Sequence, residues 1–169
     1  MPRRLVKRYA LWLYGSSEYA TFDPSLTASE LFLGLSNLHI AAGILQDEHF
    51  GDDVADAMVS HLVNWSHEML LENFLIEFLQ TNAKGSAGRK LIADWMMWSD
   101  VVSDVNCKNL VQQIQDADFC YAVAKAVLRK TCKEWEGDLV PPYVASPCFY
   151  HTHSDVARAG CGVKGESGR

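Results

Sequence analysis

Apolar residues recur at three- and four-residue spacing along most of the chain before Pro141. This spacing places apolar side chains on one face of an α-helix, whereas a half-buried strand needs alternation at every second residue. No stretch of the chain alternates convincingly with period two. The pattern therefore predicts an all-α protein with little or no β-sheet, in which helix hairpins stack on their neighbours through short connections.

Start and stop signals divide this pattern into separate helices. Thr27-Ala28-Ser29-Glu30 matches a capping box, in which the Thr27 hydroxyl and the Glu30 carboxylate satisfy free backbone amides at a helix start. The first expected helix is Arg3–Tyr14. The second opens at Thr27 and carries Leu31 to Leu45, and the third is capped by Asp47 and carries Phe50 to Leu62. The later helices are expected at Glu68–Leu79, at Leu91 to Trp98, near Leu110–Ile114 (a short one) and at Asp118–Trp135. In the last helix we expect inward-facing Phe119, Ala122, Val123, Ala126 and Val127.

Large aromatic residues at helical spacing are typical of a core. We interpret Trp12 and Tyr14, and also Trp95 and Trp98, in this way. Since the helix of Trp95 and Trp98 is apolar almost all round, it is either deeply buried or covered by a partner.

Composition and charge exclude two classes of partner. A chain of 169 residues with 49% hydrophobic and 21% charged residues is expected to fold as one domain, or one domain with a tail. The net charge of −6 implies no general affinity for nucleic acid, and the basic stretch Arg3–Arg8 is typical of a solvated helix end. The apolar run Ala28–Leu45 contains Glu30 and His39, so we predict a buried helix and no membrane span.

The cysteine pattern bears on location. The chain has five cysteines, an odd number, and Cys107, Cys120 and Cys132 lie in predicted helical surroundings without the spacing of a disulfide framework. No signal peptide is visible. The sequence therefore favours a reducing, intracellular location, either cytoplasmic or nuclear.

Three stretches taken together resemble fungal BTB/POZ-domain proteins. Val6–Tyr19 (VKRYALWLYGSSEY) is similar to the family's aromatic helix and turn, and Leu38–Leu62 is similar to a helix pair that carries a leucine-glutamine-aspartate motif. Ile76–Trp98 and Pro147–Cys161 (PCFYHTHSDVARAGC) resemble the family's later helical segment and its terminal cysteine-histidine tail.

The resemblance also implies a division of the chain. Residues 1–65 would be the C-terminal helical half of a BTB-like domain, 66–136 a helical extension similar to a BACK domain, and 137–169 a tail whose end, Gly160–Arg169, we expect to be disordered. A whole BTB domain begins with elements that build a three-stranded sheet and the main dimer surface, and this chain begins at the helix that follows them. We therefore expect a shortened relative or an incomplete reading frame, whose first two helices expose surface that the sheet normally covers.

Cys148, His151, His153 and Cys161 form the metal-like cluster of the sequence. Structural zinc takes four tetrahedral ligands of thiolate and imidazole type, and this short segment could supply all four. Binding would tie down a tail that otherwise has little core, because metal binding there would be folding free energy. The cluster makes a structural zinc ion the candidate cofactor. The alternative is a polar tail with two solvated histidines and two free thiols.

Motifs for catalysis are absent from the sequence. It contains no G-x-S-x-G elbow, H-E-x-x-H pair, P-loop or G-x-G-x-x-G. We interpret Cys120 and Cys132 as buried, inert thiols, and Asp52, Asp53 and Asp56 as a solvated helix face that lacks the pattern of a calcium loop. We predict a protein that is not an enzyme and has no catalytic or cofactor-binding residues.

The function expected from the resemblance is protein–protein interaction. It implies self-association, adaptor work for cullin-type ubiquitin ligases, or transcriptional regulation. The partner is then a protein or a second copy, with no nucleic acid and no membrane. The alternative from the residues themselves is a zinc-stabilised regulatory protein that uses its C-terminal tail.

Overall fold

The computed structural model describes residues 2–64, 72–99, 114–136, 140–145 and 147–151. Every regular element in these ranges is a helix, and none of these residues lies in a strand. The elements are α1 (Arg3–Leu13), η1 (Ser17–Ala20), α2 (Ala28–Leu45), α3 (Glu48–Val63), α4 (Glu72–Thr81), α5 (Ala87–Trp98), α7 (Ala117–Glu136), α8 (Pro142–Ala145) and η3 (Pro147–Tyr150). The all-α prediction is confirmed, whereas the stacking of hairpins stays a prediction.

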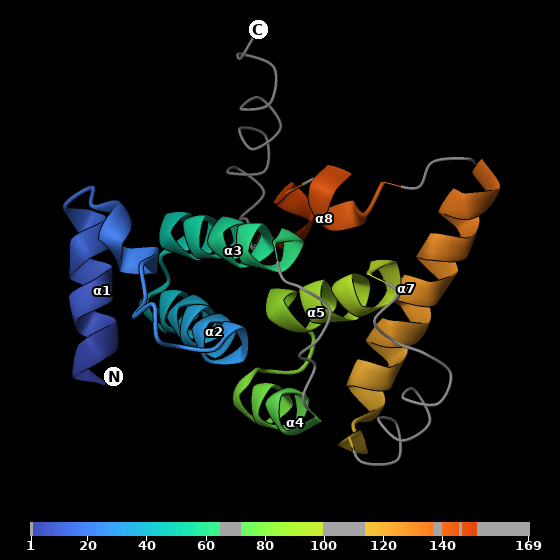
Figure 1. Ribbon diagram of the computed structural model, residues 1–169, viewed down its shortest axis with the longest axis horizontal. Coiled ribbons are helices and arrows are strands. Elements are labelled where there is room, and N and C mark those ends of the chain that lie inside the picture. The colour runs from blue at the N-terminus through green and yellow to red at the C-terminus, as the bar shows by residue number, and fades with distance from the viewer. Residues whose placement is uncertain (1, 65–71, 100–113, 137–139, 146, 152–169) are drawn as a thin grey trace, which may run out of the picture.

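The helices follow one another across the molecule from α1 at one end to α7 at the other (Figure 1). In the middle, α2 packs against α3, α3 contacts α5, and α2 contacts α4. At the far end, α5 packs against α7. The C-terminal elements α8 and η3 return to this middle layer, where α8 contacts α5 and η3 contacts both α3 and α5.

The helix starts are fixed by local hydrogen bonds that the sequence predicts. Thr27 Oγ1 accepts from the Glu30 amide at 3.2 Å, and the Glu30 carboxylate accepts from the Thr27 amide at 2.8 Å, which completes the capping box. Asp47 Oδ1 accepts from the Phe50 amide at 3.0 Å and caps α3. Between these helices Gln46 adopts the left-handed conformation, with φ of 55°, so that α3 turns back on α2.

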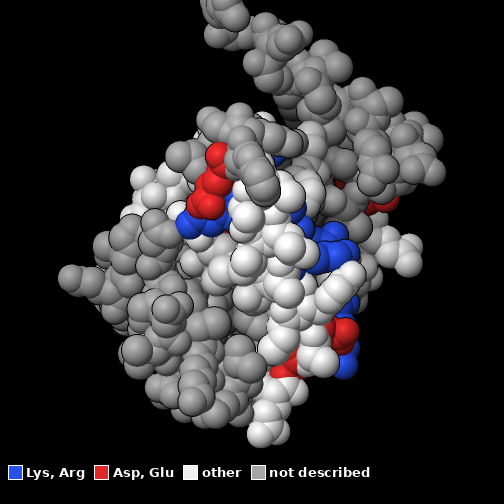
Figure 2. Space-filling view, turned by 90° about the vertical axis from the view of Figure 1, so that its right-hand side faces the viewer, with Lys and Arg blue, Asp and Glu red and all other residues white. Residues whose placement is uncertain are grey.

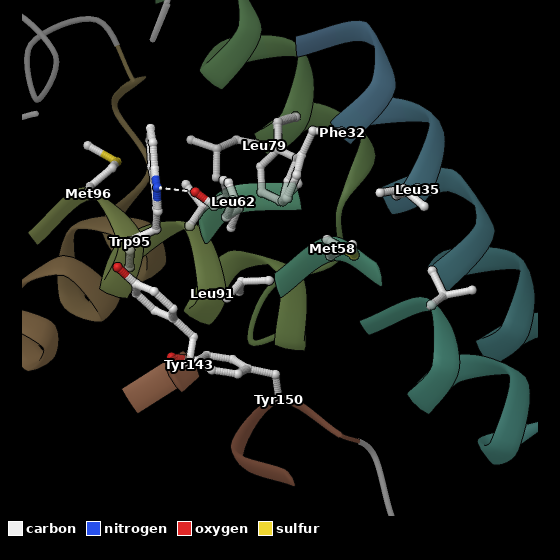
Figure 3. Close-up of a cluster of buried hydrophobic side chains, with 14 of the residues drawn as sticks. Phe32, Leu35, Met58, Leu62, Leu79, Leu91, Trp95, Met96, Tyr143 and Tyr150 are labelled. Carbon is white, nitrogen blue, oxygen red and sulfur yellow. Dashed lines mark hydrogen bonds between the residues drawn. The ribbon is translucent and has the colours of Figure 1, made fainter. Parts of the chain in front are cut away.

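One continuous core runs through the described helices (Figure 3). Its largest fully buried side chains are Trp95, Tyr150, Phe32, Phe50, Phe78, Phe119, Leu35, Leu38, Met58, Leu62, Leu75 and Leu91. Burying each such side chain contributes about 1.5–3 kcal/mol. The indole of Trp95 also donates to the Leu62 carbonyl at 3.2 Å, which ties α5 to the end of α3. This core crosses the division into residues 1–65 and 66–136, which stays a prediction.

Helix α2 is long and apolar enough, by length and composition alone, to cross a membrane. A core helix can have the same properties, and Phe32, Leu35 and Leu38 on α2 are buried against the other helices. Packing accounts for the apolar residues on the inner face of this helix, whereas Ile44 and Leu45 at its end are exposed, so the expected buried helix is found in part. That the protein has no membrane partner stays a prediction.

Two expectations about α7 are wrong. Val127 was expected to face inward, but 44% of its surface is exposed, and Cys132 is exposed rather than buried. Successive helical residues are turned by about 100°. Because Ala126 faces the core, the next residue turns outward. Of the large aromatics, Trp95 is buried as expected, whereas Tyr14 is 90% exposed.

The expectation of a tail with little core is also wrong for its first part. Tyr143 on α8 and Tyr150 on η3 are buried, and both belong to the main core. Figure 3 shows the two rings lying against the part of α5 that carries Leu91 and Trp95. A sequence that looks polar and irregular is thus fastened to the protein by two tyrosines.

Candidate functional site

A buried carboxylate holds the C-terminal elements on the core. Asp94 is 0% exposed, and it lies on α5 between Ala93 and Trp95. Arg129 from α7 donates through Nη2 to Asp94 Oδ1, and the Tyr150 hydroxyl donates to Asp94 Oδ2 at 2.7 Å. These two partners neutralise and satisfy a charge that would otherwise be very unfavourable inside the protein.

The same carboxylate affects the two buried tyrosines. Burial first, and then the charge of Asp94, raise the pKa of Tyr143 to about 12. Burial and Asp94 also raise the pKa of Tyr150 above its ordinary value. The Tyr150 phenol therefore stays protonated at neutral pH and serves as a hydrogen-bond donor.

His151 docks the end of this segment on α3. Its Nε2 donates to Asp56 Oδ1 at 2.9 Å, and its Nδ1 lies 3.9 Å from Asp52 Oδ2. The His151 side chain is almost completely buried, and so is most of the Asp52 side chain. On the adjacent α2, burial first and then the charge of His151 lower the pKa of His39. The interpretation of this acidic face as solvated is therefore wrong at Asp52, because η3 covers it.

Two of the four predicted metal ligands lie within the described residues. Cys148 is disulfide-bonded, and His151 is paired with Asp56, while His153 and Cys161 lie outside the described residues. Within the described ranges, no group of three or more histidine, cysteine or acidic side chains is placed to hold a metal ion. Zinc binding by Cys148 needs the thiolate, so the disulfide would have to open first. The structural zinc ion stays a prediction, as does the reducing location.

Helix α1 is attached to the protein along one face, through aromatic packing and hydrogen bonds. Tyr9 donates to Asp47 Oδ2 at 2.8 Å, and the Trp12 indole donates to Asp53 Oδ2 at 2.7 Å. Both rings pack around Phe50, with ring centroids at 5.1 Å. None of the eleven residues of α1 is fully buried.

Beside this packed face, α1 and its C-cap residue expose three apolar side chains, next to the exposed basic residues Arg3, Arg4 and Lys7. Leu13 is 58% exposed and Tyr14 is 90% exposed, and Val6 is about half exposed. At the end of α2, which lies beside α1 in Figure 1, Ile44 is 71% exposed and Leu45 is also exposed. We call these residues, Val6, Leu13, Tyr14, Ile44 and Leu45, the N-terminal apolar surface.

Two features of the site, the Asp94 network and the His151–Asp56 pair, could not be predicted from the sequence. The Asp94 network could have been suspected from one signal, a carboxylate in the middle of an apolar helix, but its partners lie 35 and 56 residues away along the chain. The pairing of His151 with Asp56 spans 95 residues and has no local signal.

Comparison with known proteins identifies no relative: no protein-family model, no curated protein and no solved structure matches the chain. The resemblance to BTB/POZ proteins therefore stays a prediction.

Proposed function

We propose that the protein is a non-enzymatic protein–protein interaction module of the BTB/POZ-like kind, which self-associates through the N-terminal apolar surface. The observation that carries this proposal is that α1 has no buried residue and turns Leu13 and Tyr14 to solvent. Adaptor work for a ubiquitin ligase or for transcriptional regulation would then follow from the resemblance, with this surface as the contact.

The energetics of α1 support the proposal. Isolated helices shorter than about 12–15 residues are marginal in water, and most helical stability in proteins comes from packing of an apolar face. Helix α1 has 11 residues and packs only one side on the protein. Covering Val6 and Leu13 by a second copy would remove these apolar side chains from water and stabilise the helix.

The clustering of the exposed side chains also supports it. Single exposed apolar residues are ordinary on protein surfaces, whereas a contiguous patch is typical of an interaction site. Tyr9, on the same helix as Leu13, donates to Asp47, which follows Leu45 by two residues. The C-terminal end of α2 therefore lies beside the middle of α1, and a second copy related by a twofold axis could cover the exposed residues of both helices.

Sedimentation velocity over a concentration series tests the proposal. We expect the wild-type protein to form dimers, and Leu13→Asp and Ile44→Asp to shift it to monomers without loss of helical circular dichroism. The matched control is Leu128→Asp, because Leu128 is 65% exposed, between Leu13 and Ile44, but lies on α7 at the other end of the molecule. A wild-type protein that stays monomeric at high concentration, or a control that dissociates the dimer equally well, would contradict the proposal.

A further inference from the structure

A pocket of about 360 Å³ lies between the start of α5, the middle of α7 and η3. Four basic residues, Arg89, Lys90, Lys125 and Arg129, line it together with a single acidic residue, Asp118. Figure 2 looks onto this side of the molecule and shows basic side chains gathered across the middle of the face. Such a concentration of positive charge is unexpected in a chain whose net charge is −6. The pocket is separate from the N-terminal apolar surface and does not depend on it.

Arg89 contributes positive charge to the pocket, but its nitrogens are already bonded within the protein. Its Nε donates to the Asn82 carbonyl at 2.9 Å, its Nη1 to Asp116 at 2.8 Å, and its Nη2 to the Leu79 carbonyl. Each of its three nitrogens therefore already donates a hydrogen bond within the protein. The one acidic residue of the lining, Asp118, is itself paired with Lys84 at 3.0 Å, which offsets its charge.

The other three basic residues have donors to offer. Arg129 binds Asp94 through Nη2, but its Nε is buried and has no hydrogen-bond partner within the described part of the protein. Lys90 and Lys125 are exposed, and neither forms an ion pair with any described residue. An anion in the pocket would pair with the two lysines and with the positive charge of Arg129.

Two aromatic rings form part of the pocket wall. Tyr121 and Phe149 both line it, and each ring already carries a cation over its face. The Lys125 ammonium lies 4.7 Å from the Tyr121 ring centroid, and the Arg129 guanidinium lies 5.5 Å from the Phe149 ring centroid. Flat apolar surfaces beside cations suit a ligand that is itself flat and apolar at one end and anionic at the other.

We propose that this pocket binds a small organic anion with a flat, aromatic-like body, whose anionic group lies among Lys90, Lys125 and Arg129 and whose body lies between Tyr121 and Phe149. The volume suits such a molecule, because small-molecule sites begin at about 300 Å³.

Titration of the ¹⁵N-labelled protein by NMR tests this inference, with 1-naphthoate as the probe and its neutral analogue 1-naphthamide as the comparison. We expect naphthoate to shift the amide signals of α5 and α7 and to bind at least about tenfold more tightly than the amide. The double variant Lys90→Gln, Lys125→Gln should lose about tenfold in affinity, since both lysines are exposed and the fold does not depend on them. The control for a loss of charge is Lys7→Gln on α1. This variant should keep wild-type affinity for naphthoate.

A second variant tests whether the ligand occupies the pocket volume. Ala122→Leu narrows the pocket and should abolish naphthoate binding, whereas Ala124→Leu places the same bulk on an exposed position of α7 and should leave it unchanged. Equal binding of the acid and the amide, wild-type affinity in the double lysine variant, or equal losses in Lys7→Gln would overturn the inference. Inorganic phosphate that binds as tightly as naphthoate would overturn the assignment of a flat ligand.

Discussion

The substitution Tyr150→Phe removes one hydroxyl from the centre of the protein and keeps the ring. That hydroxyl donates to Asp94 Oδ2 at 2.7 Å, in a place where Asp94 is 0% exposed and Tyr150 is fully buried. Water cannot enter to replace the donor without disturbing the packing. The variant therefore leaves one oxygen of a buried carboxylate without its hydrogen bond.

The expected cost follows from the charge and from the remaining partner. A hydrogen bond to a charged group contributes about 1.5–3 kcal/mol net, and burial places this bond toward the upper end of that range. Arg129 still pairs with the other carboxylate oxygen, so the loss should stay below the roughly 3–5 kcal/mol of a buried ion pair that loses one member. We expect Tyr150→Phe to lower the free energy of unfolding by roughly 2–3 kcal/mol.

Equilibrium unfolding in urea, followed by tryptophan fluorescence and circular dichroism, measures this loss. The midpoint should fall while the slope stays unchanged, because a similar surface is exposed on unfolding. Tyr121→Phe is the matched control, since Tyr121 is 63% exposed and surface changes of this kind stay within about 0.5 kcal/mol. If Tyr150→Phe costs no more than this control, the Asp94 network does not hold the C-terminal elements.

Three further predictions concern other parts of the core. Gly34→Ala should destabilise by roughly 1–3 kcal/mol in urea unfolding, because a Cβ there would overlap the Phe22 ring. Gly43→Ala is the control within α2: a Cβ there meets nothing within 4 Å, so it should stabilise, and a loss like that of Gly34→Ala would contradict the steric reason. Arg89→Met should cost roughly 2–4 kcal/mol in the same assay, because it removes a buried guanidinium that bonds Asp116 and the carbonyls of Asn82 and Leu79, and a loss below about 1 kcal/mol would contradict this. Burial lowers the pKa of His39 in the folded protein. As the pH falls, His39 therefore takes up a proton at a higher pH in the unfolded state than in the folded state, so the free energy of unfolding should fall below about pH 6.5. His39→Gln should weaken this dependence in urea midpoints measured between about pH 7.5 and 5.5, and an unchanged dependence would show that another group causes it.

The helices could be predicted from the sequence because their signals are local. Arg3–Tyr14 was expected and α1 spans Arg3–Leu13, while Asp118–Trp135 was expected and α7 spans Ala117–Glu136. Each start depends on hydrogen bonds within three or four residues of chain, as the Asp47 cap illustrates. Such contacts form in the same way whatever the rest of the protein does.

The candidate sites could not be predicted in this way, because distant parts of the chain build them. His151 looked like a metal ligand beside Cys148, but in the structure its partner Asp56 comes from α3. Val127 looked apolar enough for the core, yet helical rotation turns it to solvent. A single sequence shows that a side chain needs a partner, but not which partner the fold supplies.

The C-terminal segment therefore connects parts of the chain that the sequence treats as separate. Tyr150 binds Asp94 on α5, and the next residue, His151, binds Asp56 on α3. Two adjacent residues thus fasten both central helices from one side, with Cys148 only two residues before them. Whatever changes the bonding of Cys148, whether reduction or metal, acts next to the Tyr150 hydrogen bond. Its effect should reach the core through this hydrogen bond, and a double-mutant cycle that combines Cys148→Ser with Tyr150→Phe measures that coupling.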